Sequence, residues 1–329
     1  MVPAPRPIDG VLPARPRKTP LSGGGLRLAA PAKLNLTLHV GPIRGDGFHP
    51  VRSIVAKVTL YDDVLLRPRF DGRIALRCTG ADCGPAEGNL AVRAARLLAE
   101  ATGAEPGAAD IELSKSIPPG AGLGGGSSDA AAVLEGLAEL WDIALPPERL
   151  AELAGRLGSD VPLFLGPPAA SVSGRGERVE AARVHPFTAV VHLPPIVCPT
   201  AEVYAAFDRL WQNREGGVRH GPPGAHAGVE KGDRHLRCAS EPVPFFGEPP
   251  STWRGELRND LAAAAFVVSD ELRRTHAALA EAAGLPVSVT GSGSGLFILC
   301  DDAEEARAVL GRLPADLPGR TVLVGLNPF

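Results

Sequence analysis

A glycine-rich segment near the middle of the chain carries the residue types best suited to binding a phosphate. It runs Pro118, Pro119, Gly120, Ala121, Gly122, Leu123, Gly124, Gly125, Gly126, Ser127, Ser128. Glycines let the backbone approach a ligand closely. The residues that follow predict a helix, whose first N–H groups are unpaired and whose dipole is positive at that end. The segment therefore predicts a phosphate-binding loop to which the two serines add hydroxyl groups.

Three other interpretations of this loop compete with that prediction. A Walker loop needs a lysine before its final Ser or Thr, and Gly126 stands there. The dinucleotide spacing G-x-G-x-x-G is present from Gly120 to Gly125, but a second helix, rather than a parallel strand, is expected after the first. A glycine turn without a ligand would lose backbone entropy with no compensating contact. The pattern favours a loop of proline, Gly-Leu-Gly, small residues and serines that opens a helix.

The elements that would position this loop mix two periodicities. Alternating apolar residues predict strands at 26–40, 51–61, 63–69, 73–80, 111–117, within 168–197, at both ends of 286–300, and at 320–325. Helical spacing predicts helices at 89–103, 127–143, 146–160, 259–283 and 302–313. This order favours an α+β fold in two lobes. We expect an N-terminal ATP-binding domain over 26–180 and a C-terminal domain over 181–329.

Two segments lack a usable periodicity. Residues 1–25 are rich in Pro and Gly, which predicts a disordered tail. Residues from about 209 to 257 contain Gly, Pro and mixed charges, which predicts a long insertion. Such an insertion acts as a lid, an oligomer contact or a plain solvent loop, and the composition favours the last.

The composition excludes several classes of protein. The chain has 329 residues, of which 44% are hydrophobic and 22% charged, with a net charge of -3, as in a soluble globular protein. It lacks the basic excess expected of a nucleic-acid partner. No run approaches the roughly 18 apolar residues of a membrane span, and the start lacks the apolar core of a secretory signal. We expect a cytoplasmic monomer or homodimer without a membrane or nucleic-acid partner.

The cysteines do not form a disulfide framework by their spacing. Their number is odd and they are scattered, which predicts reduced structural thiols: Cys78, Cys83, Cys198, Cys238, Cys300.

Three ordered motifs resemble those of the GHMP kinases. They are residues 31–36 (PAKLNL), the loop at 118–128 and residues 290–295 (TGSGSG). Residues 46–49 (DGFH), 157–162 (LGSDVP) and the pair Asn89-Leu90 are similar to the branch of that family that phosphorylates 4-diphosphocytidyl-2-C-methyl-D-erythritol. The resemblance covers about residues 27–208 and 256–327.

The resemblance implies a fold and a reaction. The fold has an N-terminal lobe like domain 2 of ribosomal protein S5 and a ferredoxin-like C-terminal lobe, with the site between them. ATP would phosphorylate the 2-hydroxyl of the methylerythritol unit, a step of non-mevalonate isoprenoid synthesis. Asp160 matches the family's general base, because a hydroxyl nucleophile must lose its proton. Lys33 matches its catalytic lysine, which keeps that carboxylate ionised and offsets charge on the phosphoryl group.

The resemblance also assigns binding residues. Phe48 would stack on cytosine and His49 would hydrogen-bond it, with Tyr204 as the second aromatic. Asn35 and Gly293 would shape the substrate site. ATP would lie over residues 118–128, with Asn89 and Lys115 near the nucleotide. No protein metal ligand is expected beside the loop, so Mg²⁺ would arrive mainly on the phosphates of ATP.

Two alternatives stay open. Another GHMP kinase would act on mevalonate, homoserine or a sugar, but residues 46–49 and 160–162 argue against it. A catalytically silent nucleotide-binding homologue would not need Lys33 and Asp160.

Overall fold

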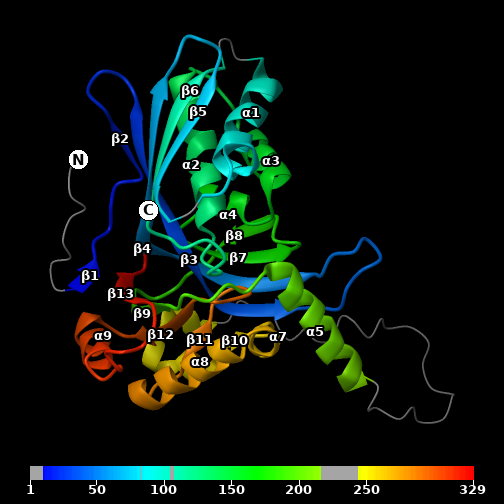
Figure 1. Cartoon of the computed structure of the whole chain (residues 1–329), viewed down its shortest axis with the longest axis vertical. Helices are drawn as coiled ribbons and strands as arrows, with labels where there is room; N and C mark the ends of the chain where they lie inside the picture. The colour runs from blue at the N-terminus through cyan, green and yellow to red at the C-terminus, as the bar shows by residue number, and fades with distance from the viewer. Residues whose placement is uncertain (1–9, 82, 104–106, 216–243) are drawn as a thin grey trace.

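The computed structural model has two β-sheets, each covered by helices, in an upper and a lower lobe (Figure 1). It describes residues 10–81, 83–103, 107–215 and 244–329. The larger sheet has the order β10-β3-β4-β6-β5, with β2 beside β3 and the β7–β8 pair beside β4. The smaller sheet has the order β1-β13-β9-β12-β11. The predicted α+β architecture in two lobes is confirmed.

The larger sheet is built around two long antiparallel strands. Its members are β2 (Lys18–Pro20), β3 (Leu26–Val40), β4 (Val51–Pro68), β5 (Ile74–Gly80), β6 (Ala109–Lys115), β7 (Ala169–Gly174), β8 (Arg178–Ala181) and β10 (Arg258–Asn259). One half of β4 pairs with β6 and the other half with β7. The prediction of two strands joined near Asp62 is wrong. Asp62 stays within β4 because its fully buried carboxylate has its own donors, the N–H groups of Ser116 and Ile117.

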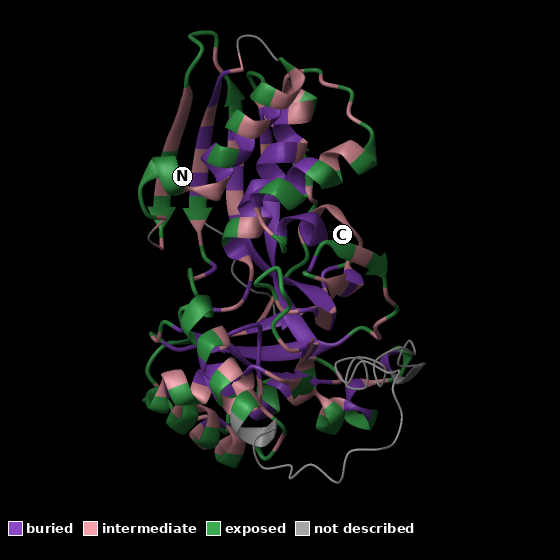
Figure 2. Ribbon diagram, turned by 90° about the vertical axis from the view of Figure 1, so that its right-hand side faces the viewer, coloured by how far each residue is buried: buried purple, intermediate pink, exposed green. Residues whose placement is uncertain are grey.

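Four helices cover the upper lobe's side of this sheet. They are α1 (Leu90–Thr102), α2 (Gly125–Leu140), α3 (Pro147–Leu157) and α4 (Val161–Leu165). Figure 2 shows that the buried residues gather between these helices and the strands. Leu98 of α1, Leu134 of α2 and Leu66 of β4 belong to this core. Most residues of α2 are buried, and this helix begins at Gly125, within the glycine loop.

The smaller sheet forms the lower lobe. Its strands are β1 (Val11–Leu12), β9 (Thr188–Leu193), β11 (Ser288–Val289), β12 (Leu296–Cys300) and β13 (Arg320–Gly325), and its helices are α5 (Thr200–Glu215), α7 (Ala262–Val268), α8 (Asp270–Ala283) and α9 (Ala303–Leu310). The prediction of one helix over 259–283 is wrong. The chain turns extended at Ser269, whose hydroxyl accepts the N–H of Leu272 at 3.1 Å and caps α8.

The two lobes share a hydrophobic core. Leu34 of β3 and Val58 of β4 pack with Val191 of β9 and Phe297 of β12 in one cluster. Strand β10 comes late in the chain but pairs parallel to β3. The boundary that we place at residue 180 therefore divides the sequence but not the hydrophobic core, which is continuous between the two lobes.

The predicted disordered tail is wrong for residues 10–25; residues 1–9 lie outside the described residues. Strand β1 pairs parallel to β13, and β2 pairs antiparallel to β3. Arg17 also forms an ion pair with Glu135 at 2.6 Å. Two-residue and three-residue strands are too short to leave a periodicity, so the composition alone pointed to disorder.

The predicted insertion at 209–257 is wrong at both ends. Helix α5 continues to Glu215, and residues 244–256 form short 3₁₀ turns at Pro244–Gly247, Pro250–Thr252 and Arg254–Glu256. Phe246 and Trp253 are buried in the shared core, with ring centroids 4.7 Å apart. These aromatic side chains anchor the segment despite its Gly and Pro content. The remainder, 216–243, lies outside the described residues.

Cys78 and Cys83 form a disulfide, so the prediction of reduced thiols is wrong for this pair. Cys78 lies in β5 and the chain returns within five residues, which brings the two Cα atoms to 6.6 Å. Cys198 and Cys300 are free and buried.

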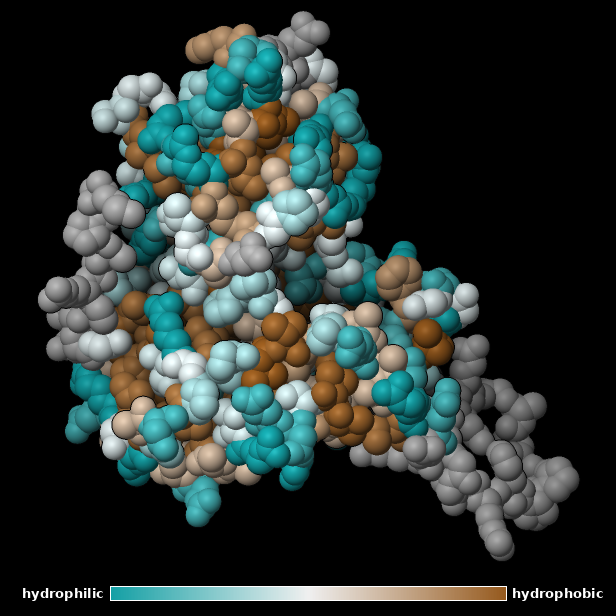
Figure 3. Space-filling model, viewed as in Figure 1, coloured by the Kyte–Doolittle hydropathy of each residue, from teal (hydrophilic) through white to brown (hydrophobic). Residues whose placement is uncertain are grey.

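The surface is mixed in character. The face in Figure 3 carries hydrophobic residues gathered over the lower lobe among hydrophilic ones. Of the helices in the described part of the chain, none combines the length and apolarity needed to cross a bilayer.

Candidate active site

A cleft of about 980 Å³ is lined by residues of both lobes. The upper lobe supplies the glycine loop, and the lower lobe supplies the start of α5 and the 290–295 turn. The sequence-predicted residues found in its lining are Lys33, Asn35, Phe48, His49, Asp160, Tyr204 and each residue from Pro118 to Ser127. Segments that lie far apart in the sequence thus meet at one cavity.

The glycine loop packs directly against the turn at residues 290–295. Gly122 has φ +72°, and a Cβ there would lie 2.1 Å from the carbonyl oxygen of Thr290. The N–H of Gly295 donates to the carbonyl of Ala121 at 3.0 Å. Only glycine fits this close approach of two backbones.

The N-terminus of α2 forms part of the cleft lining. The helix begins at Gly125, and no side chain caps it. The first N–H groups of a helix have no intrahelical acceptor, so an anionic phosphate fits there. Gly124 also lacks space for a side chain, because a Cβ would meet the Phe164 ring at 2.8 Å and Lys33 at 3.2 Å. The loop residues therefore fit the phosphates of a nucleotide.

Lys33 and Asp160 both line the cleft beside this cradle. Lys33 is 4% exposed on β3, its Nζ donates to Asn35 Oδ1, and its N–H donates to the carbonyl of Leu123 at 3.0 Å. Burial lowers the pKa of Lys33, and the charge of Asp160 opposes that effect. Asp160 is exposed at the N-terminal end of α4. Its carboxylate is accessible to a hydroxyl in the cleft.

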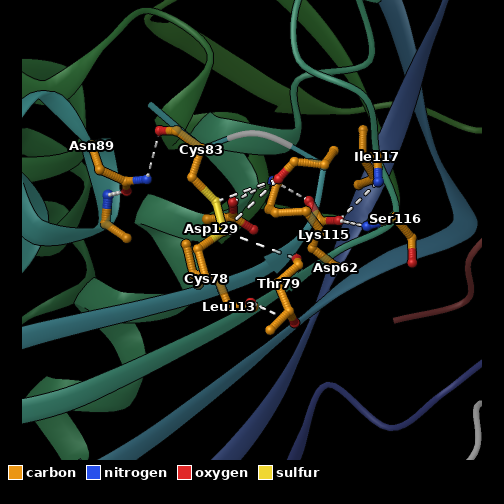
Figure 4. Close-up of polar contacts among 12 residues, drawn as sticks. Asp62, Cys78, Thr79, Cys83, Asn89, Leu113, Lys115, Ser116, Ile117 and Asp129 are labelled. Atoms are coloured by element: carbon orange, nitrogen blue, oxygen red, sulfur yellow. Dashed lines mark hydrogen bonds and ion pairs between the residues drawn. A yellow bond between two sulfur atoms is a disulfide. The ribbon is translucent and has the colours of Figure 1, made fainter. Parts of the chain in front are cut away.

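A buried ion cluster fixes the start of the loop (Figure 4). Asp62 accepts the N–H groups of Ser116 at 2.6 Å and Ile117 at 2.8 Å, and it also pairs with Lys115. Lys115 pairs with Asp129 of α2 as well. Burial, with the neighbouring Asp62, raises the pKa of Asp129 to about 7 against the attraction of Lys115. The cluster joins β4, the end of β6 and α2.

Four sequence-predicted residues do not line the cleft. Lys115 is held by the two carboxylates, and its side chain is 6% exposed. Asn89 caps α1: its Oδ1 accepts the N–H of Ala91 at 2.9 Å and its Nδ2 donates to Cys83 at 3.3 Å. Ser128 is buried, and its hydroxyl has no partner among the described residues. Gly293 lies behind the lining, which Gly291 and Ser292 form instead.

The far end of the cleft carries an aromatic and acceptor-rich group. The Nδ1 of His49 lies 2.9 Å from the carbonyl of Gly41, so this nitrogen carries the proton. Its Nε2 lies 3.5 Å from a carboxylate oxygen of Asp208, and the two groups form an ion pair when the imidazole is protonated. The ring of Tyr204 lies 5.0 Å from that of His49. Burial, with the charge of Asp160, raises the pKa of Tyr204 to about 12, so it stays a neutral phenol.

The sequence reasoning missed Arg175 and Asp208, both of which line the cleft. The Arg175 guanidinium lies 4.5 Å from the centre of the half-exposed Phe48 ring. Gly174 and Gly176 flank it with φ +77° and +115°, and a Cβ on Gly176 would meet Ser159 at 3.0 Å. The sequence GRGE is itself a turn signal, which could have identified Arg175 as a side chain on a hairpin tip.

The described residues offer no protein cage for a metal. Among them, no group of three or more His, Cys, Asp or Glu side chains is placed to hold an ion. Near the start of α2, the hydroxyl of Ser128 and the Oδ1 of Asp129 each lack a hydrogen-bond partner among the described residues.

Family models match two parts of the chain. "GHMP kinases N terminal domain" matches residues 89–167, and "GHMP kinases C terminal" matches residues 251–319. The second match begins inside the predicted insertion, in agreement with the packed residues there.

Full-length relatives cover most of the chain. A 4-diphosphocytidyl-2-C-methyl-D-erythritol kinase of Pelotomaculum thermopropionicum is 39% identical over 86% of this chain and 92% of its own length. The enzyme of that name from Ralstonia nicotianae is 38% identical over 88% and 91%.

Solved structures agree with these relatives. A 4-(cytidine 5'-diphospho)-2C-methyl-D-erythritol kinase matches with TM-score 0.66 and 34% identity, over 91% of this chain and 99% of that one. A homoserine kinase of Cytophaga hutchinsonii matches with TM-score 0.61 at 17% identity, over 94% and 98%, and this likeness concerns the fold alone.

Proposed function

Since the chain belongs to the 4-diphosphocytidyl-2-C-methyl-D-erythritol kinase family of the GHMP kinases, we propose that it transfers the γ-phosphate of ATP to the 2-hydroxyl of that compound. The product is the 2-phosphate, in non-mevalonate isoprenoid synthesis. One observation carries the proposal. A phosphate cradle, a lysine–aspartate pair and a nucleobase-sized aromatic end line a single cleft.

The geometry of the cleft supports a role for each reacting group. Phosphates lie over residues 118–127, where α2 presents free N–H groups. Asp160 takes the proton of the attacking 2-hydroxyl, and Lys33 offsets negative charge on the transferring group. ATP supplies the phosphoryl group and brings Mg²⁺ mainly on its own phosphates. Positioning and electrostatics therefore account for most of the catalysis.

The cytidine end of the substrate suits the Phe48 end of the cleft. A cytosine carries an exocyclic amine, a donor, and the Asp208 carboxylate beside the His49 ring supplies an acceptor for it. Phe48 and Tyr204 supply ring faces for stacking. The diphosphate between the two halves of the substrate needs a cation. Arg175 stands beside Phe48, and its guanidinium suits bidentate phosphate binding.

Both substrates are small molecules. We propose that the enzyme is cytoplasmic, that it is a monomer or a homodimer, and that it has no nucleic-acid or membrane partner. Residues 26–180 would form its ATP-binding domain and residues 181–329 its second domain.

The deciding experiment is ADP release by the purified protein with ATP, Mg²⁺ and 4-diphosphocytidyl-2-C-methyl-D-erythritol, beside mevalonate and homoserine. We expect turnover with the cytidylyl substrate alone. Turnover with another alcohol would keep the ATP site and overturn the substrate. Silence with all three, together with ATP binding, would support a non-catalytic nucleotide-binding protein.

A further inference from the structure

Lys57 is a buried lysine to which neither the substrate sites nor the catalytic pair assigns a role. It lies in β4 with an exposed fraction of 0%. Among the described residues, no carboxylate forms an ion pair with it. A lysine so placed must find other acceptors, because an unpaired buried cation is costly. Only five of the 34 Lys and Arg residues in the chain are lysines, so the presence of a lysine rather than an arginine at position 57 is informative.

The acceptors of Lys57 are the last carbonyl groups of α4. Its Nζ donates to the carbonyl of Gly166 at 2.6 Å and to that of Phe164 at 3.3 Å. The final carbonyl groups of a helix have no intrahelical donor, and a cation there also suits the helix dipole. Burial lowers the pKa of Lys57 to about 7. A neutral amine still has two N–H groups, so both contacts persist after deprotonation.

The backbone of Lys57 holds the same segment and the end of the chain. Its N–H donates to the carbonyl of Pro168 at 2.8 Å, and its carbonyl accepts the N–H of Asn327 at 2.9 Å. Lys57 is also the cross-strand partner of Lys33, so the two side chains leave the sheet on the same face. Lys33 lines the cleft, and Lys57 bonds the C-terminal end of α4 beside it.

The other end of α4 carries Asp160. The helix has five residues, which corresponds to about 7.5 Å at the usual rise. Phe164, in the last turn, places its ring against Gly124 of the phosphate loop, where a Cβ would approach within 2.8 Å. The position of this helix end therefore bears on both the general base and the phosphate cradle.

We propose that Lys57 is a positioning residue for phosphoryl transfer, which fixes the C-terminal end of α4 and thereby sets the place of Asp160 and of Gly124. The proposal rests on the reaction proposed above. Lys57 does not line the cleft in which the substrates would bind. Its loss should lower the rate of the bound complex and leave substrate affinity nearly intact, because a displacement of about 1 Å costs up to roughly 100-fold in rate.

The test compares Lys57→Met with Tyr61→Phe. Tyr61 lies in the same strand, and its hydroxyl donates to Asn327 at 3.1 Å, away from α4. Lys57→Met loses two side-chain hydrogen bonds, and Tyr61→Phe also loses two, one to Asn327 and one from the N–H of Arg15. The rates are measured at a temperature below the unfolding midpoint of each variant. We expect Lys57→Met to lower kcat 10-fold to 100-fold, with the KM values for ATP and for the cytidylyl substrate within about threefold of wild type. Tyr61→Phe should keep kcat within about twofold.

A second variant and a second measurement guard against loss of the fold. Lys57→Gln keeps a shorter N–H donor, so it should recover part of the kcat lost in Lys57→Met, and it decides the question if the methionine variant does not fold. Amide hydrogen exchange of residues 161–166 should accelerate in either variant without any substrate.

Two results would overturn the proposal: a wild-type kcat in the folded variant, or equal losses of kcat in Lys57→Met and Tyr61→Phe. Unchanged exchange across α4 would also count against it. If the wild-type protein does not turn over the cytidylyl substrate, the proposed reaction fails instead, and the exchange measurement still tests the role of Lys57.

Discussion

At the scale of single residues, Asp160 is the side chain whose chemistry is easiest to isolate. It is exposed in the cleft at the start of α4. Asp160→Asn keeps the shape and removes the proton acceptor. We expect binding of ATP and substrate within about threefold of wild type, and a loss of 100-fold or more in kcat. Calorimetry and steady-state rates measure the two quantities.

The matched control for this variant is Asp208→Asn. Asp208 lines the same cleft at its other end, beside His49. Its loss should raise KM for the cytidylyl substrate and leave kcat within a few-fold. An Asp160→Asn enzyme with near-normal kcat would remove Asp160 from the role of general base.

Arg175 provides a separate prediction at this scale. Its guanidinium lies over the ring of Phe48 in the cleft. Arg175→Gln should raise KM for the cytidylyl substrate about tenfold and leave KM for ATP unchanged, because a charged hydrogen bond contributes roughly 1.5–3 kcal/mol.

Arg178 serves as the control for Arg175. It is exposed on β8 of the same hairpin and does not line the cleft. Arg178→Gln should leave both KM values unchanged. Equal effects of the two substitutions would point to a general change in surface charge rather than diphosphate binding.

The limits of sequence reasoning at this scale have a physical cause. Lys33 and Asp160 lie within motifs, so their types and spacing identify them. Asn89 also lies within a motif, yet its side chain caps α1 through the N–H of Ala91. Lys115 lies beside the loop, yet its ammonium group is held by Asp62 and Asp129. The contacts of Lys115 join separate segments of the chain, and no spacing along the sequence encodes them. Lys57 lies in no motif, and its contacts with Phe164 and Gly166 also join segments that are far apart in the sequence.

At the scale of elements, the contact between the glycine loop and the 290–295 turn is testable. Gly122→Ala would put a Cβ 2.1 Å from Thr290 and force φ +72° on an alanine. We expect a loss of roughly 2 kcal/mol or more in unfolding free energy, together with a fall in activity, since the loop must move. Denaturant unfolding and ADP release measure these effects.

Gly155→Ala is the matched control for this element. Gly155 lies inside α3, and a Cβ there would meet nothing within 4 Å. This change should stabilise the protein by about 0.5–1 kcal/mol and leave activity unchanged. A stable, active Gly122→Ala protein would show that the two segments do not need their close approach.

Elements with long, regular periodicity were predictable, and those set by tertiary contacts were not. Strand β3 and helix α1 agree with their patterns within a residue or two. The continuous β4 depends on partners for a buried Asp62, and β1, β2 and β10 are two or three residues long. Edge strands of this length are stabilised by the neighbouring strand alone, so the chain carries no local signal for them.

At the scale of the whole molecule, the shared core determines how the lobes unfold. Residues of β3, β4, β9 and β12 belong to one buried cluster, and two segments from late in the chain, β10 and Asn327, bond β3 and β4. A two-lobed outline would allow two separate transitions. The continuous packing predicts one cooperative transition instead, because neither lobe can lose its half of the core alone.

Two tryptophans report on the two regions. Trp141 packs against the upper-lobe core and donates to the carbonyl of Ala108 at 3.2 Å, while Trp253 is buried in the shared core. One variant retains Trp141 (Trp211→Phe with Trp253→Phe), and the other retains Trp253 (Trp141→Phe with Trp211→Phe).

Within each variant, the fluorescence midpoint in urea should coincide with the midpoint from far-UV circular dichroism. ATP at 100 times its Kd should raise the stability at both reporters by about 2.7 kcal/mol, since it binds the folded cleft alone. A Trp253 transition that precedes the loss of secondary structure, or an ATP shift seen at Trp141 only, would mean that the lower lobe unfolds independently and that the shared core is not a single cooperative unit.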